Sequence, residues 1–317
     1  DGRIITALNE EAVVSACLAN KGGLNLVASY EAFCVKMLGA VRQELIFARH
    51  QRLAGRPANW LGFPLIATSH TWENGKNEQS HQDTSFCEAL LGEMHDGMRV
   101  LFPADYNSTL ALLPGVFQAR GRLACMVIAK RDSPVRMDAA QAQLLADQGA
   151  ILLAEHRSGT EPVLLIANGG YQLGEMLRAS QRLTTHGQSW KLVYLQEPGR
   201  FSIPRDHLEA GCAAPPKLTE KLFPAALQRR VMLTHMRPEV LRGHLHNLLP
   251  SPSHSRVMGY INQGGTLDEA GMLFANRCSW AHVLVAAAQV LEQDPQAWMD
   301  EYEWAAVNGL GNPAILR

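Results

Sequence analysis

Apolar and polar positions alternate along the first half of the chain with two different periods, which predicts a succession of strands and helices. Short apolar runs typical of buried strands occupy residues 24–28, 63–67, 99–103 and 123–129. Longer segments with an apolar residue every three to four positions predict helices over residues 10–19, 30–52, 107–120 and 138–145. Asn9 is the expected N-cap of the first helix, and Ser85 with Glu88 predicts a capping box for a further helix.

The alternation restarts after a polar segment, residues 155–162, which ends in Pro162. Beyond it, strands are expected at 163–167, 191–195, 230–234 and 257–261, and helices at 174–185 and 279–291. Strands that alternate with helices favour parallel sheets with helices on both faces. We therefore predict an α/β protein of two domains, residues 1–157 and 158–317, each built on a mainly parallel sheet.

Composition narrows the class of protein. The 317 residues are 47% hydrophobic and 19% charged, with a formal net charge of -1, so charge gives no argument for nucleic acid or an anionic membrane as partner. No apolar run approaches the roughly 20 residues of a membrane span. The six cysteines are scattered without a C-x-x-C pair, which indicates reduced core cysteines and a cytoplasmic location. The start at Asp1 suggests a fragment, a processed chain or a preceding segment.

The common catalytic and binding motifs are absent from the sequence or only weakly matched. The sequence has no P-loop, no G-x-S-x-G and no H-E-x-x-H. Asn168-Gly169-Gly170 is similar to a dinucleotide-binding turn but lacks the full glycine spacing, so a tight strand-to-helix turn is the favoured interpretation. His235, His244 and His246 could be considered a metal cluster, but no cysteine or i,i+4 partner supports it.

The segment 68–83, TSHTWENGKNEQSHQD, contains no aliphatic side chain and follows a predicted strand. In parallel α/β sheets ligands bind beyond the carboxyl ends of strands. The segment offers many hydrogen-bonding groups, and Lys76 adds a charge that could meet a phosphate. A solvated surface loop is the alternative, and composition alone does not decide between the two.

The same segment carries a resemblance to a known family. Thr68-Ser69, Trp72, Asn77 and Ser80-His81-Gln82-Asp83 resemble the TS…W…N…SHQD segment of the thiamine-diphosphate-dependent phosphoketolases. Other similar stretches follow the family's order: DGR at residues 1–3, SYEAF at 29–33, AKR at 129–131, and GY with GGT at 259–266. The chain is thus identified as phosphoketolase-like, with the pyrimidine-binding and C-terminal domains of a transketolase-like fold.

The resemblance implies a cofactor and a reaction. Thiamine diphosphate with Mg²⁺ would supply the chemistry, cleaving a ketose phosphate such as xylulose 5-phosphate or fructose 6-phosphate with inorganic phosphate to acetyl phosphate and an aldose phosphate. Glu10 matches the glutamate that hydrogen-bonds the aminopyrimidine and promotes its imino tautomer. An acidic residue in a first helical turn also simply complements the helix dipole. The spacing from Glu10 to Tyr30 is about two residues shorter than the family's, so Glu11 remains a rival.

The other matched residues would surround the cofactor ring and the sugar. Tyr30 and Phe33 match the aromatic pocket around the aminopyrimidine, although ordinary core packing explains them equally. His81 matches a histidine near the reacting carbon that can transfer protons. Asn77 and Lys130 match contacts to the sugar phosphate.

Four positions depart from the family pattern. Lys76 stands where the family carries histidine and Asn74 where it carries glutamine, and Glu78-Gln79 replaces Gly-Phe. Lys76 could still bind a phosphate, but these changes leave the preferred ketose open.

The chain has no Gly-Asp-Gly segment of the kind that begins the magnesium and diphosphate site in related enzymes. The resemblance therefore implies a diphosphate-binding domain or subunit in trans, which would also carry the metal ligands, and an isolated chain without activity. A homodimer is expected, with no role for nucleic acid or membrane. Two alternatives stay open: a transketolase or two-oxo-acid dehydrogenase beta-subunit-like component, and a non-catalytic dimerisation or regulatory module. We expect the C-terminal half to serve packing and assembly.

Overall fold

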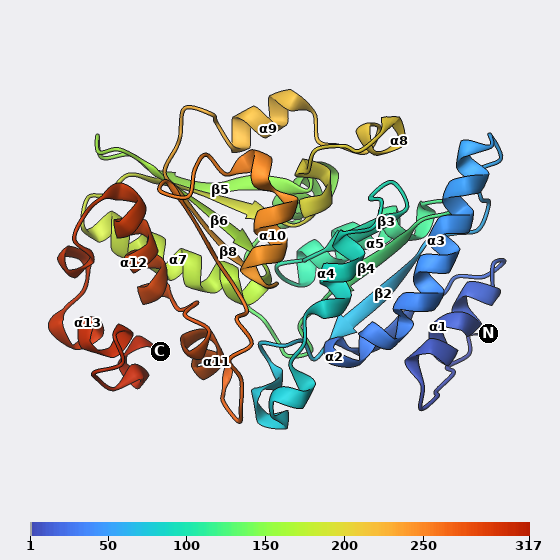
Figure 1. The fold of residues 1–317 in the computed structure, drawn as a ribbon, viewed down its shortest axis with the longest axis horizontal. Coiled ribbons are helices and arrows are strands. Elements are labelled where there is room, and N and C mark those ends of the chain that lie inside the picture. Colours follow the sequence, from blue (N-terminus) through green and yellow to red (C-terminus); the bar gives the residue numbers. More distant parts are fainter. Residues whose placement is uncertain (1) are drawn as a thin grey trace.

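The computed structural model describes residues 2–317 and contains two sheets that lie side by side (Figure 1). The first sheet has the order β1-β2-β4-β3, and each neighbouring pair is parallel. Its strands are β1 (Val27–Tyr30), β2 (Phe63–Thr68), β3 (Met98–Leu101) and β4 (Leu123–Val127). The predicted α/β class is confirmed.

The second sheet has the order β5-β7-β6-β8-β9, and only β5 is antiparallel to its neighbour. Its strands are β5 (Ala150–His156), β6 (Val163–Asn168), β7 (Trp190–Leu195), β8 (Arg230–Thr234) and β9 (Ser255–Met258). The hydrophobic pattern missed β5, because this edge strand exposes much of its length to solvent. The predicted domain boundary after residue 157 follows β5, and the division into two domains at that point stays a prediction.

Helices cover both faces of the first sheet, as the period-two pattern of its strands requires. Leu123 and Cys125 of β4 pack in one core with α1 (Glu10–Ala19), α3 (Leu38–Leu53) and α4 (Ser85–Leu91). Ala124 and Met126 point the other way, toward α5 (Tyr106–Gln118) and α6 (Ala139–Gln148). Successive residues of one strand thus serve two separate cores.

The second sheet is covered in the same way. Leu165 and Tyr194 pack with α7 (Gly170–Thr185) and α12 (Trp280–Leu291). Leu164 and Ile166 face α9 (Pro216–Leu222) and α10 (Pro238–His244), in a core that continues into that of the first sheet. The shorter helices are α2 (Glu31–Cys34), α8 (His207–Ala210), α11 (Glu269–Ala275) and α13 (Glu301–Val307). Within residues 2–317, no helix combines the length and apolar character needed to cross a bilayer.

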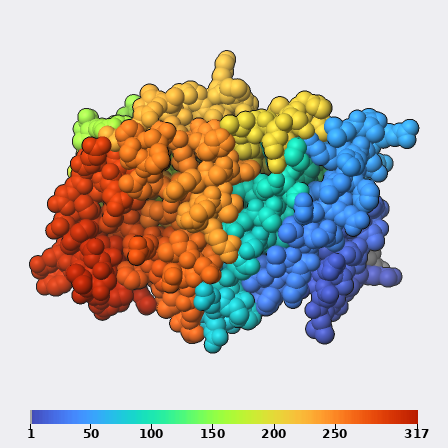
Figure 2. Space-filling view, in the orientation of Figure 1, coloured from blue at the N-terminus to red at the C-terminus, as the bar shows by residue number. Residues whose placement is uncertain are grey.

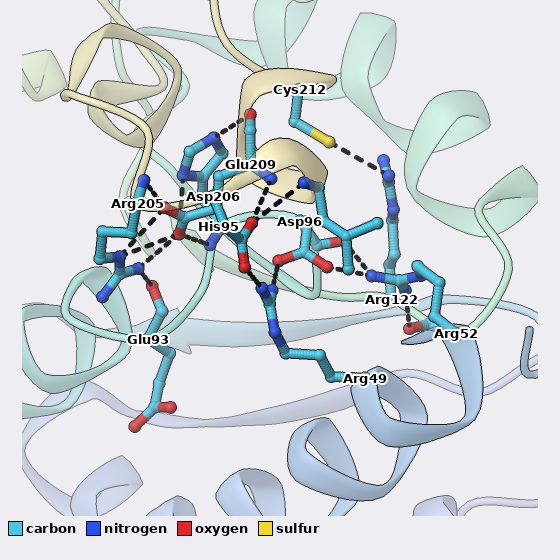
Figure 3. A network of polar contacts seen from close by, with 12 residues as sticks. Arg49, Arg52, Glu93, His95, Asp96, Arg122, Arg205, Asp206, Glu209 and Cys212 are labelled. Carbon is cyan, nitrogen blue, oxygen red and sulfur yellow. Dashed lines mark hydrogen bonds and ion pairs between the residues drawn. The ribbon is translucent and has the colours of Figure 1, made fainter. Parts of the chain in front are cut away.

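Charged side chains join the two halves on the side of α3 and α8. The Arg49 guanidinium binds the carboxylates of Asp96 and Asp206, and Arg205 binds Glu209 (Figure 3). Glu209 also accepts a hydrogen bond from the His95 N–H at 3.1 Å. Because the segment with Asp206 and Glu209 belongs to the second half, these contacts fix one sheet against the other.

Two local expectations differ from the structure, and a third is confirmed. The helix predicted over 30–52 begins at residue 31, because Tyr30 ends β1, and a 3₁₀ turn interrupts it before α3. The capping box of Ser85 with Glu88 is wrong. Ser85 is already the first helical residue, and its N–H and hydroxyl donate to Asp83. The predicted N-cap Asn9 is confirmed, since its side chain accepts the Glu11 N–H.

Candidate functional site

The polar segment 68–83 is divided between interior and surface. Residues 69–75 are buried, while residues 76–80 are exposed. Figure 2 shows the segment beside the residues near 262–268 of the second half, at the lower centre of the molecule. The interpretation as a solvated loop therefore holds only for its tip.

The buried part of the segment makes contacts across the two halves. Trp72 is fully buried, and its indole N–H donates to the carbonyl of His235 at 3.1 Å. The carboxylate of Glu73 accepts the N–H groups of Lys130 and Arg131 and the hydroxyl of Tyr171. Glu73 thus connects the polar segment to the residues after β4 and to α7.

The SHQD and GY…GGT stretches, more than 170 residues apart in sequence, meet in space. The Tyr260 hydroxyl donates to the Gln82 carbonyl at 3.0 Å, and the Gln82 amide donates to the Gly265 carbonyl at 3.1 Å. A Cβ on Gly264 would lie 1.9 Å from Gln82 Oε1, so a larger residue there would displace the Gln82 amide. The two motifs form one structural unit.

Glu10, the predicted catalytic residue, lies on the first turn of α1 and faces β1. Its Oε1 lies 3.4 Å from the Ser29 hydroxyl, and its Oε2 lies 3.3 Å from Lys36 Nζ. Oε2 is buried and has no hydrogen-bond partner among the described residues. The side chain is 18% exposed, whereas that of the neighbouring Lys36 is 55% exposed. Its rival Glu11 is exposed.

The aromatic residues of the prediction lie at the carboxyl end of β1. The rings of Tyr30 and Phe33 are nearly parallel, with centroids 6.2 Å apart, and the His81 ring meets Phe33 edge-on at 5.1 Å. Lys130 Nζ donates to the Tyr30 hydroxyl at 3.0 Å. This hydrogen bond and the charge of Lys130 lower the pKa of Tyr30.

Contacts thus connect five predicted residues, which we call the ring cluster: Glu10, Tyr30, Phe33, His81 and Lys130. The link from Glu10 to the rings runs through Lys36, whose ammonium lies 5.1 Å from the Phe33 centroid. Asn77 instead donates to Asn74 at 2.8 Å, and Lys76 is exposed. Within residues 2–317 no contact of Lys76 or Asn77 with the ring cluster is recorded. The roles of all seven residues stay predictions.

Sequence reasoning missed a buried polar group directly beside the ring cluster. Glu31 follows Tyr30, and its Oε1 lies 2.7 Å from His235 Nε2 of the second half. Its Oε2 accepts the Thr71 N–H at 2.8 Å. Burial raises the pKa of Glu31, but His235 and the hydrogen bonds outweigh it and hold that pKa below its usual value. No local sequence pattern could have revealed this pair, because the two partners are 204 residues apart.

Cys87 completes a potential metal-ligand set with Glu31 and His235, since their donor atoms lie within 4.8 Å of one another. Burial raises the pKa of the Cys87 thiol well above its usual value, and a protonated thiol is a poor ligand. The thiol instead faces the Thr84 carbonyl at 3.2 Å. We interpret the set as hydrogen bonding at the interface.

Sequence comparison places the family match on the half that holds the ring cluster. Residues 1–119 match the sequence model described as D-xylulose 5-phosphate/D-fructose 6-phosphate phosphoketolase. A probable phosphoketolase of Streptomyces avermitilis is 28% identical over 168 residues, which cover 52% of this chain and 21% of the relative. The resemblance to phosphoketolases is confirmed. The matched part amounts to about a fifth of that relative's length.

Solved structures show that the fold is transketolase-like. A transketolase mutant from Pichia stipitis superposes with a TM-score of 0.65 at 14% identity, covering 84% of this chain and 34% of that one. A split-gene transketolase, solved as an inactive β4 tetramer, superposes with a TM-score of 0.59 at 16% identity. It covers 90% of this chain and 82% of its own. At 14–16% identity these structures show a similar fold and nothing about function.

Proposed function

We propose that this chain supplies the pyrimidine-binding face and the C-terminal part of a phosphoketolase-like enzyme. The reaction would cleave xylulose 5-phosphate or fructose 6-phosphate with inorganic phosphate, yielding acetyl phosphate and an aldose phosphate. The observation that carries the proposal is the ring cluster: a carboxylate, two parallel aromatic rings, an imidazole and an ammonium group on one face of a phosphoketolase-like segment.

The ring cluster fits the aminopyrimidine of thiamine diphosphate. Within residues 2–317 the buried Oε2 of Glu10 has no hydrogen-bond partner and contacts the Lys36 ammonium at 3.3 Å, so it could still accept a hydrogen bond from a ring nitrogen. Tyr30 and Phe33 offer apolar surface beside it. When bound, the cofactor supplies the carbanion chemistry that no protein side chain provides.

The remaining residues would act on the sugar. His81 stands against Phe33 and also accepts or donates at Ser80, so its imidazole can exchange a proton with a substrate hydroxyl. Lys130 is held by its backbone at Glu73 and presents its ammonium group toward the rings, where a phosphate dianion would be neutralised. Asn77 and Lys76 at the exposed tip would complete the phosphate contact on closure around the sugar.

We further propose that the diphosphate and Mg²⁺ are bound by a domain or subunit outside these 317 residues, and that the assembly is a dimer in the cytoplasm. Diphosphate needs a metal ion for neutralisation and placement. The split-gene transketolase, inactive as a tetramer of one subunit, is a precedent in fold for such a division.

The decisive experiment combines this chain with a phosphoketolase diphosphate-binding half and measures phosphate-dependent acetyl phosphate from each ketose phosphate. Glu10→Gln should lower turnover by about a hundredfold or more, because a general acid–base contact is lost. Glu11→Gln is the matched control and should leave turnover within about twofold, since Glu11 is exposed. Equal loss in both variants, or loss in Glu11→Gln alone, would contradict the assignment of Glu10.

Calorimetry on the isolated chain tests the division of the cofactor site. We expect no binding of thiamine diphosphate with Mg²⁺ in the micromolar range, because the charged diphosphate finds no metal site here. Micromolar binding would show instead that the chain holds the whole cofactor.

A further inference from the structure

A large pocket lies between the two halves, beyond the carboxyl ends of strands from both sheets. Its volume is about 870 Å³, within the roughly 300–1,000 Å³ usual for small-molecule sites. Segments after β2, β3 and β4 line one side, and Gly169 to Gln181 with His235 line the other. Of the ring cluster only Lys130 reaches it, so the pocket is distinct from the cofactor face.

One arginine in this pocket, Arg136, has no side-chain partner recorded within residues 2–317. Among the cationic lining residues, Arg131 pairs with Glu269, Arg178 bonds Glu175 and the Leu316 carbonyl, and Lys130 bonds Tyr30. For the guanidinium of Arg136, no hydrogen bond or ion pair is recorded anywhere in residues 2–317. A Cβ built on Gly174 would lie 3.5 Å from its Nη2, so the charge sits over the first turns of α7.

Arg136 is exposed, so water solvates its charge, and the feature that points to an anion is its position over the start of α7. The N-terminal end of a helix carries partial positive charge, and its first N–H groups lack intrahelical acceptors. No side chain caps α7 at Gly169. Gly169 has φ +115, and a Cβ on Gly170 would lie 3.0 Å from the Ala104 carbonyl oxygen, so Gly170 brings the helix end against the first half. An anion would satisfy the amides and Arg136 together.

A second observation is a buried imidazole in the pocket wall. His70 is 4% exposed, and its Nδ1 has no hydrogen-bond partner. The ring stands edge-on to those of Tyr171 and His235, with centroids 5.4 and 5.0 Å away. Burial lowers the pKa of His70 to about 4, so the unpartnered nitrogen belongs to a neutral imidazole that can bind a hydroxyl group.

Two of the three acidic lining residues are bonded to other groups. Asp105 accepts hydrogen bonds from Ser108, Arg136 N–H and Met137 N–H, and Glu175 accepts the Trp280 N–H and pairs with Arg178. Asp132 is exposed and has no recorded partner within residues 2–317. The lining holds four cationic and three acidic side chains, and Glu269 outside it pairs with Arg131. Phe102, Tyr106 and Leu273 add apolar surface.

We infer that this pocket binds a small organic phosphate, with the phosphate between Arg136 and the N-terminal end of α7 and a hydroxyl-bearing body near His70. Inorganic phosphate alone would fill only a small part of the volume. The pocket shares only Lys130 with the ring cluster, and the proposal does not require the proposed reaction.

The test is calorimetric titration of the full 317-residue chain with ribose 5-phosphate, adenosine 5′-phosphate and inorganic phosphate. We expect at least one ester to bind more tightly than inorganic phosphate. Arg136→Gln should weaken that binding by about tenfold or more, the value of one charge-assisted contact to phosphate. The imidazole resonances of His70 should shift on saturation with the ester.

Two matched variants locate the binding. Arg242→Gln removes the same charge from an exposed position outside the pocket and should change affinity less than about twofold. Lys76→Gln removes a cation from the predicted sugar site and should likewise have little effect. No detectable binding of either ester at 10 mM overturns the proposal. That concentration is about a hundred times the dissociation constant typical of specific metabolite sites. A loss in Lys76→Gln without one in Arg136→Gln, or equal losses in Arg136→Gln and Arg242→Gln, also overturns the proposal.

Discussion

The ring cluster and the neighbouring contact of Glu31 with Thr71 and His235 differ in burial and in hydrogen bonding. We call this contact the interface. Tyr30 and Phe33 are partly exposed, and Glu10 keeps a carboxylate oxygen without a hydrogen bond. Glu31, one residue after Tyr30, is enclosed and bonded to Thr71 and His235. Two adjacent residues of the SYEAF segment therefore differ: Tyr30 lies on a partly exposed face, and Glu31 belongs to a buried contact whose hydrogen bonds are satisfied.

The difference separates residues that stabilise the fold from those that are available for chemistry. Side chains with satisfied, buried contacts contribute to stability, whereas binding groups often remain unsatisfied until a ligand arrives. Substitution should therefore be costly for folding at the interface and cheap at the ring cluster.

The largest effect is expected for Glu31→Ala. The change leaves His235 and the Thr71 N–H without a partner in the interior, which typically costs about 3–5 kcal/mol. Urea unfolding followed by circular dichroism measures it. Glu31→Gln keeps a hydrogen-bonding side chain and should lose less. A loss below about 1 kcal/mol in Glu31→Ala would show that the interface is not closed as described.

Acid should destabilise the protein through His70. Burial, and then the charge of His235, lower its pKa to about 4, below the roughly 6.5 of an unfolded chain. The folded state therefore favours the neutral ring. This contribution is complete above about pH 6.5 and is lost as the pH falls toward 4, by up to about 3 kcal/mol.

The variant His70→Phe cannot titrate and should unfold with a weaker pH dependence between those values. His50→Phe, at an exposed position, is the control and should keep the wild-type slope. Parallel stability curves for wild type and His70→Phe would contradict the burial of a neutral imidazole.

A smaller loss is expected for Trp72→Phe. The phenyl ring fills less volume and leaves the His235 carbonyl without its donor, for about 1–3 kcal/mol in total. Thermal unfolding should detect this change. An unaltered midpoint would place Trp72 outside the contacts that hold the halves together.

The smallest effect on folding is expected for Glu10→Gln. It removes one ion pair with a Lys36 side chain that is 55% exposed, a type of contact worth about 0–1 kcal/mol. Urea unfolding of this variant should thus match wild type closely, while turnover of the assembled enzyme falls. A large loss of stability would assign Glu10 a structural role instead.

Much of the architecture was predictable because it depends on local periodicity. The continuous apolar run of β4 and the apolar residues of α12 identified these elements within a few residues. The edge strand β5 was missed, since its exposed side chains lack that signal. The ring cluster was predicted only through resemblance. Composition and spacing alone left Glu10 as a helix-end charge and Phe33 as a core residue.

By itself the sequence determined the α/β class, the order of most elements and the phosphoketolase-like motifs, because neighbouring residues encode backbone preference and period. Only the tertiary structure decided which polar groups are buried and which remain free. Glu31 contacts His235, and Tyr260 contacts Gln82. Arg136 lies over α7, with no acidic partner recorded within residues 2–317. Such pairings join positions far apart in the chain, and burial changes the free energy of a charge far more than its sequence neighbours do.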